Sequence, residues 1–111
     1  MKRDDPDHPI LPAAWKYEII GFHFVRSIDE CAEAFIDLTL RREADVKRLR
    51  FLAPQDVEIE KGFPRHTHGL VIRDVSARQL EGINVLVDNA ENSPGGVRFW
   101  ARAVIDLEAD S

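Results

Sequence analysis

The 111-residue chain lacks the features that mark several protein classes. A single cysteine, Cys31, excludes an intramolecular disulfide framework and a cysteine-rich zinc site. No apolar run approaches the roughly 18–20 residues that a transmembrane helix needs. The first residues hold charges and prolines but not the apolar stretch of a signal peptide. These absences predict a small soluble protein that is cytoplasmic and does not associate with membranes.

Positive charge is also scarce, because 15 Lys and Arg face 20 Asp and Glu and leave a net charge of −5. A protein that binds nucleic acid normally shows a basic surface, so we expect no nucleic-acid partner. The length fits one domain, since domains cluster near about 100–150 residues. We expect a globular domain over residues 10–108, with disordered ends at residues 1–9 and 109–111.

The dominant pattern is an alternation of apolar and polar residues with a period of two, which is typical of strands. It begins at Trp15 and places Trp15, Tyr17, Ile19, Gly21 and His23 on one face. Two alternating runs on either side of residues 42–45 predict a hairpin. Further runs follow near Val57, Leu70 and Val85. The pattern predicts an all-β or mainly β antiparallel, sandwich-like domain.

The last alternating run is the most regular one and predicts a single long strand. Its predicted buried face holds Val97, Phe99, Ala101, Ala103, Ile105 and Leu107, and its other face begins with Arg98, Trp100 and Arg102. Two short segments depart from strand patterning. Ser27–Glu30 and Ser76–Gln79 each match a capping box, and Gly82 is suited to end the second turn. We therefore expect one or two short helical turns.

Metal binding is the first candidate function. His66 and His68 share a face if the chain is extended, so both imidazoles can reach one ion. Zinc would need a third protein ligand, and none stands at a recognised spacing, although His23 or Glu60 can complete the set in three dimensions. We expect a polar loop here, with neither metal nor cofactor.

Covalent catalysis is the second candidate, and it depends on Cys31. This residue lies among apolar neighbours, where burial makes a thiol less reactive. The sequence also has no glycine-rich phosphate loop, no HExxH motif and no Ser-His-Asp arrangement. A carboxylate pair can hydrolyse glycosides, but nine aromatic residues, most of them at predicted core positions, leave few for a sugar-binding cleft. We expect a protein that is not an enzyme.

The remaining candidates are surfaces. Asp56, Glu58 and Glu60 share one strand face, which is either merely solvated or suited to a basic partner. Trp100 lies between Arg98 and Arg102, and this combination is typical of interface hot spots. Alternatively, the second sheet or the loop at residues 89–96 covers this tryptophan, or the three residues line a small-molecule or sugar site.

A further pattern runs from Leu49-Arg50-Phe51 through Gly62-Phe63-Pro64 to Gly69-Leu70-Val71-Ile72-Arg73. It continues with the turn Asp74-Val75-Ser76-Ala77-Arg78-Gln79-Leu80-Glu81-Gly82, then Ile83-Asn84-Val85 and the aromatic-rich strand Val97-Arg98-Phe99-Trp100-Ala101. Over residues 38–107 this order resembles small bacterial immunity proteins of polymorphic-toxin systems and related bacterial proteins without an assigned function. The resemblance implies a non-catalytic protein that neutralises a cognate toxin, and it brings no catalytic residues.

Arg78 in this turn can pair with Asp74 or contact a partner. We therefore expect a protein-binding domain, with a small-ligand- or sugar-binding domain as the alternative and a metal-dependent enzyme centred on His66 and His68 as the third choice. The candidate partner-binding residues are Trp100, Arg98, Arg102, Arg78, Asp56, Glu58 and Glu60.

Overall fold

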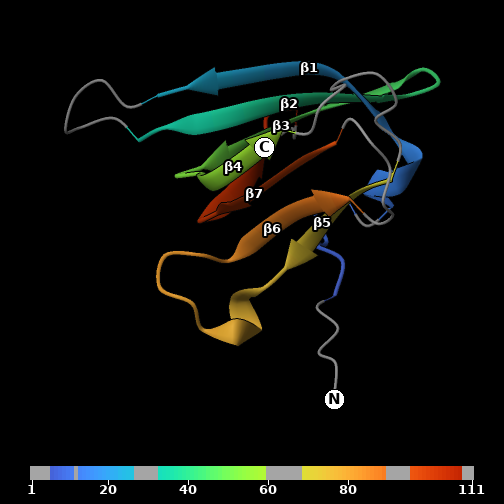
Figure 1. Ribbon diagram of the computed structural model, residues 1–111. Coiled ribbons are helices and arrows are strands. Elements are labelled where there is room, and N and C mark those ends of the chain that lie inside the picture. Colours follow the sequence, from blue (N-terminus) through green and yellow to red (C-terminus); the bar gives the residue numbers. More distant parts are fainter. Residues whose placement is uncertain (1–5, 12, 27–32, 60–68, 90–95, 109–111) are drawn as a thin grey trace.

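A computed structural model describes residues 6–11, 13–26, 33–59, 69–89 and 96–108. Within these residues the chain forms eight strands and two short 3-10 helices (Figure 1). The elements are η1 (Ala14–Lys16), β1 (Glu18–Val25), β2 (Phe35–Arg42), β3 (Asp45–Leu52), β4 (Gln55–Ile59), β5 (Leu70–Asp74), η2 (Ser76–Arg78), β6 (Val85–Asn89), β7 (Val97–Ala101) and β8 (Ala103–Asp106).

The strands form two four-stranded antiparallel sheets, which confirms the predicted all-β, sandwich-like class. One sheet has the order β1-β2-β3-β8 and the other has the order β4-β7-β6-β5. The predicted hairpin is also confirmed, because Arg42 lies opposite Asp45 across the turn between β2 and β3. The predicted helical turn at Ser27–Glu30 lies outside the described residues.

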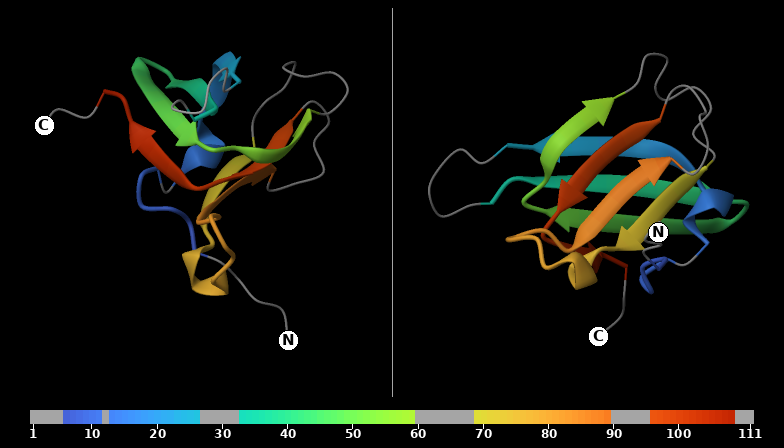
Figure 2. Two further views of the ribbon diagram at one scale, coloured as in Figure 1. Left: turned by 90° about the vertical axis from the view of Figure 1, so that its left-hand side faces the viewer. Right: turned by 60° about the horizontal axis from the view of Figure 1, so that its bottom comes forward.

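A two-stranded ribbon joins the two sheets at one corner (Figure 2). Strand β3 leads into β4, and β7 leads into β8, so Leu52 lies opposite Ala103 in one sheet while Gln55 lies opposite Trp100 in the other. The amide of Arg102 donates to the Leu52 carbonyl at 2.8 Å at the corner. Strands that pass from one sheet to another through a bend commonly make the corners of such packed sheets.

The prediction of one long strand from Val97 to Leu107 is therefore wrong. The strand breaks at Arg102, and the alternation changes phase there. Uninterrupted alternation from Arg98 would put Val104 on the polar face, yet Val104 packs against the core, whereas Ile105 is 45% exposed. The physical reason is the change of sheet, because a bend between strands need not preserve a period of two.

The start of the first predicted strand also differs. Trp15 lies in η1, and the strand begins at Glu18. The register against β2 shifts between Ile19 and Gly21, which is a β-bulge. Beyond this bulge Phe22, rather than Gly21, packs against the core. An inserted residue reverses the faces of everything that follows it, so a strict alternation fails at this point.

The short helical turn predicted at Ser76–Gln79 is confirmed as η2, but its capping differs from the predicted capping box. The Ser76 side chain makes no cap hydrogen bond in η2. Instead, the Asp74 Oδ1 atom accepts hydrogen bonds from the Ser76 amide at 3.0 Å and from its hydroxyl at 2.6 Å. Gln79 ends the turn with φ of 58°, and Gly82 follows with φ of 70°. Aspartate competes well for such local backbone bonds, so the Asp74 carboxylate, rather than the Ser76 hydroxyl, holds the start of the turn.

The core lies between the two sheets. Ile36, Leu38 and Leu40 of β2 face it from one side and are fully buried. Phe51 of β3 and Phe99 of β7 meet across the two layers, with ring centroids 5.1 Å apart and planes at 86°. This edge-to-face contact joins the sheets near the corner.

The segment before η1 was predicted to be disordered as far as Pro9. Residues 1–5 lie outside the described residues, whereas residues 6–9 lie beside β5. The His8 amide donates to the Ile72 carbonyl at 2.7 Å, and the Asp74 amide donates to the Pro6 carbonyl at 2.9 Å. These backbone bonds cover part of the β5 edge.

Candidate functional site

The outer surface of the β4-β7-β6-β5 sheet carries the residues that the sequence singled out. In β7 the side chains of Val97, Phe99 and Ala101 are buried in the core. The alternation therefore turns Arg98 and Trp100 to the outer surface, as predicted for this part of the strand.

Trp100 is half-buried. Its exposure lies between the two alternatives that the sequence left open, an exposed indole and an indole covered by the second sheet or a loop. It lies opposite Leu86 of β6, whose side chain is only 6% exposed. The guanidinium carbons of Arg78 and Arg98 lie 5.7 Å and 6.0 Å from the centre of the indole ring. Both distances allow a cation–π attraction to the ring. The indole is therefore held in place while part of its surface stays accessible.

The η2 turn brings Arg78 to the tryptophan. The two hydrogen bonds from Ser76 to the Asp74 carboxylate fix this turn. The same bonds lower the pKa of Asp74, because they stabilise its charged form. Asp74 thus holds the turn that carries Arg78.

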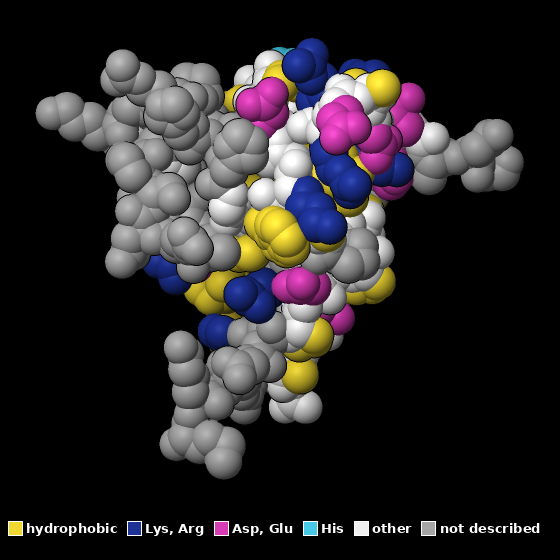
Figure 3. Space-filling view, turned by 90° about the vertical axis from the view of Figure 1, so that its right-hand side faces the viewer, with side chains coloured by type: hydrophobic (Ala, Val, Ile, Leu, Met, Phe, Trp, Pro, Cys, Tyr) yellow, Lys and Arg dark blue, Asp and Glu magenta, His cyan; other side chains and the backbone are white. Residues whose placement is uncertain are grey.

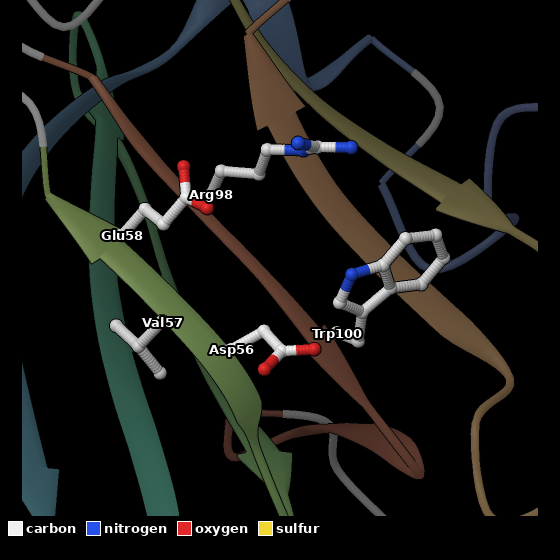
Figure 4. Close-up of a pocket in the computed structure, with 5 residues that line it drawn as sticks. All are labelled: Asp56, Val57, Glu58, Arg98 and Trp100. Carbon is white, nitrogen blue, oxygen red and sulfur yellow. The ribbon is translucent and has the colours of Figure 1, made fainter.

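Strand β4 supplies two carboxylates next to Trp100. Glu58 lies opposite Arg98, and the register shifts between Gln55 and Glu58. Asp56 lies within this irregular stretch and has φ of 54°, a left-handed conformation that aspartate tolerates better than most residues. In Figure 4 the Asp56 side chain points across β7 towards Trp100.

These side chains surround a hollow of about 360 Å³. Its lining residues are Asp56, Val57, Glu58, Arg98 and Trp100 (Figure 4). We call this feature the Trp100 hollow. Four of the seven candidate residues thus line one site, and a fifth, Arg78, reaches it through its contact with the indole.

The charges at the Trp100 hollow are only partly paired. The Nε atom of Arg98 lies 3.6 Å from the Asp88 carboxylate, so this arginine is drawn to β6 rather than to Glu58. Within the part of the chain that the structure describes, Asp56 and Glu58 have neither an ion pair nor a side-chain hydrogen bond. With Asp88, three carboxylates stand against the two arginines around the indole.

One described candidate residue, Arg102, is not part of the lining of the hollow. Arg102 follows the bend, and its guanidinium makes two hydrogen bonds to Glu33, at 2.6 Å and 3.1 Å. The chain changes sheet between Trp100 and Arg102, and the pair with Glu33 draws the Arg102 side chain elsewhere. Glu60 lies outside the described residues.

The metal and nucleophile candidates His66, His68 and Cys31 also lie outside the described residues. His23 lies on the other sheet, where its ring meets that of Phe35 at 6.5 Å. Across residues 6–11, 13–26, 33–59, 69–89 and 96–108 there is no group of three or more metal-binding side chains. In the same ranges no helix has the length and apolar character needed to cross a membrane.

Sequence reasoning missed Asp88, which orients Arg98. The residue alternates with Val85 and Val87 in the same run, so its outward placement is readable from the pattern. Alternation alone does not predict that β6 lies beside β7, because this depends on the order of the strands in the sheet.

Comparisons with models of protein families, with curated proteins and with solved structures give no match for this chain. The resemblance to bacterial immunity proteins therefore stays a prediction, and the Trp100 hollow is the feature of the chain that bears on its function.

Proposed function

We propose that this chain is a non-catalytic protein-binding domain that uses the Trp100 hollow to dock a basic surface of another protein. The more specific form of the proposal is an immunity protein that neutralises a cognate toxin in a bacterial cytoplasm. One observation carries the proposal: a half-buried tryptophan, held between two arginines, lies beside two carboxylates that lack an ion-pair partner among the described residues.

Tryptophan and arginine supply much of the binding energy at protein interfaces. Trp100 has the features of such an interface residue, because its indole is held by arginine contacts and is still partly accessible. A fixed side chain loses little conformational entropy when a partner docks. This favours an anchoring role for Trp100.

The two carboxylates favour a basic partner. Asp56 and Glu58 are exposed and add to a net charge of −5. A lysine or arginine from the partner can reach between these carboxylates and the indole, where it gains both charge attraction and contact with the ring. Complementary charge of this kind also speeds association.

The test is an affinity pull-down with tagged protein from a lysate of the source organism, read by mass spectrometry. We expect one stoichiometric basic protein with the wild type. W100A should weaken binding of the purified pair by about 2 kcal/mol or more. Exchanging Asp56 and Glu58 for Asn and Gln should slow association, most of all at low salt.

R102A is the matched control, because Arg102 is an arginine of the same chain segment that lies away from the hollow. It should bind like the wild type. A partner that binds W100A and the wild type equally well would place the interface elsewhere. The absence of any stoichiometric protein partner in repeated trials would overturn the proposal.

A small-ligand or sugar site is the second candidate, and the volume of the hollow favours it. About 360 Å³ falls within the range of roughly 300–1,000 Å³ that is typical of ligand sites. The lining is mostly charged, however, whereas such sites are mostly apolar. A sugar that raises the thermal midpoint of the wild type but not of W100A would favour this candidate.

A further inference from the structure

A second hollow lies where η1 meets the turn between β2 and β3. Its strands belong to the sheet that does not carry the Trp100 hollow. It has a volume of about 600 Å³. Its lining residues are Trp15, Lys16, Glu18, Arg41, Arg42 and Glu43. We call it the Trp15 hollow. Figure 3 views the molecule from this side, where Lys and Arg side chains gather beside hydrophobic ones.

Trp15 is held on a fixed backbone although its side chain is 50% exposed. Its neighbours Ala14 and Tyr17 are buried in the core. The Tyr17 hydroxyl donates a hydrogen bond to the Asp45 carboxylate, which ties η1 to the start of β3. The fold therefore presents a large aromatic surface to solvent at a defined position, without a covering element among the described residues.

Three cations line the Trp15 hollow. The Lys16 amino group lies 5.2 Å from the ring centre. Arg41 and Arg42 end β2, and within the described ranges neither guanidinium has an ion pair or a side-chain hydrogen bond. Arg41 lies opposite Glu18 in the register, yet the two do not come within ion-pair distance. Glu18 and Glu43 of the lining and Asp45, which lies opposite Arg42, balance the three cations in number. Asp45 accepts the hydrogen bond of Tyr17, so among the described residues the Arg41 and Arg42 guanidinium groups keep their donors for a ligand.

We propose that the Trp15 hollow binds a small ligand with a phosphate group next to a planar ring, the chemistry of a nucleoside monophosphate. The ring would stack on the Trp15 indole, which is a sequence-tolerant contact for bases. Arg41 and Arg42 would hold the phosphate, because guanidinium groups match its oxygens with paired hydrogen bonds. The volume suits a ligand of this size.

The two tryptophans allow a direct test, since the chain has only Trp15 and Trp100. In an NMR spectrum of the ¹⁵N-labelled full chain, each indole N–H gives one signal, so each hollow has its own reporter. The four ribonucleoside 5′-monophosphates are titrated separately, with the matching nucleosides and inorganic phosphate as comparison probes. We expect at least one nucleotide to shift the Trp15 signal saturably while the Trp100 signal stays in place.

Affinity should depend on both parts of the ligand. The nucleoside without phosphate should bind about tenfold more weakly or worse, since charge-assisted hydrogen bonds are lost. The double variant R41Q/R42Q should weaken nucleotide binding by a similar factor of about ten. The matched control is R48Q/R102Q, which removes the same charge from two arginines outside the hollow.

Three outcomes would overturn the proposal: no saturable shift of the Trp15 signal with any of the four nucleotides, equal shifts of both indole signals, or equal weakening by R48Q/R102Q and R41Q/R42Q. The unchanged Trp100 signal in each variant verifies that it is folded. Because the readout is Trp15, the result is independent of whether the Trp100 hollow binds a protein.

Discussion

At the scale of single residues, Phe99 shows how one strand serves both stability and the candidate site. It is fully buried and packs edge-to-face on Phe51, while its neighbours Arg98 and Trp100 face outward. F99A should lower the free energy of unfolding by about 3–5 kcal/mol, because it leaves a cavity between the sheets. Urea unfolding followed by circular dichroism measures this change.

The matched control for this prediction is F24A. This substitution removes the same side chain from the surface, because Phe24 is 47% exposed. It should lower the free energy of unfolding by well under half as much. If F99A left the urea midpoint almost unchanged, the assignment of Phe99 to the core would be wrong.

The outward residues of the Trp100 hollow were partly predictable at this scale. Arg98 and Trp100 belong to one regular strand, so alternation alone puts them on one face. Arg78 was named as a candidate, but its contact with the indole depends on where the η2 turn lies relative to Trp100 of β7. Asp88 reaches Arg98 only because two strands are neighbours in the sheet. Contacts of this kind are set by tertiary structure and leave no local signal.

At the scale of elements, the segment before η1 has a pH dependence that can be measured. His8 is half-buried beside β5, and its Nδ1 atom accepts a hydrogen bond from the Ile10 amide at 3.1 Å. Burial lowers the pKa of His8 below its ordinary value of 6.5, and the nearby Asp74 charge only partly opposes this. The unfolded chain therefore binds a proton more readily than the folded chain.

The direction in which stability changes with pH follows from this difference in proton binding. The contribution of His8 to stability is complete above its unfolded pKa and is lost as the pH falls from about 6.5 through the lower folded pKa. Asp74, whose pKa is lowered by the Ser76 hydrogen bonds, loses its contribution only below 3.8. The two effects are therefore separated in pH.

We expect the urea midpoint of the wild type to fall between about pH 7.5 and about pH 5.5. In H8N the fall should be smaller, because asparagine keeps an acceptor for the Ile10 amide but does not titrate. H23N serves as the control and should fall like the wild type, since His23 lies on the exposed side of β1. Identical pH profiles for H8N and the wild type would contradict this role of His8.

The strands themselves were largely predictable, and their irregularities were not. The hairpin at residues 42–45 and the runs at β5, β6 and β7 follow from alternation and turn residues. The bulge near Ile20 and the bend at Arg102 each change the phase of the alternation. Consecutive apolar residues stand near both points, Ile19-Ile20 and Val104-Ile105, so the sequence there fits either phase. Packing between the sheets decides which residues face the core after each change of phase, as with Phe22 and Val104.

At the scale of the whole molecule, the corner makes the two sheets one structural unit. Strands β3 and β4 are separated only by Ala53 and Pro54, and β7 and β8 only by Arg102. Separating the sheets would therefore break both strand crossings and the Phe51–Phe99 contact. A small domain joined in this way should unfold in one cooperative transition.

The two tryptophans test this cooperativity, because Trp15 lines a hollow with Glu18 of β1 and Arg41 of β2, whereas Trp100 lies in the other sheet. In W100F the fluorescence reports on Trp15 alone, and in W15F it reports on Trp100 alone. For each variant, the urea transition seen by fluorescence should coincide with the one seen by circular dichroism. Comparison within one variant removes any change of stability that the substitution causes. A fluorescence transition that precedes the circular dichroism signal in only one variant would mean that the sheets unfold separately, and the corner would then be a hinge between two units rather than a joint within one.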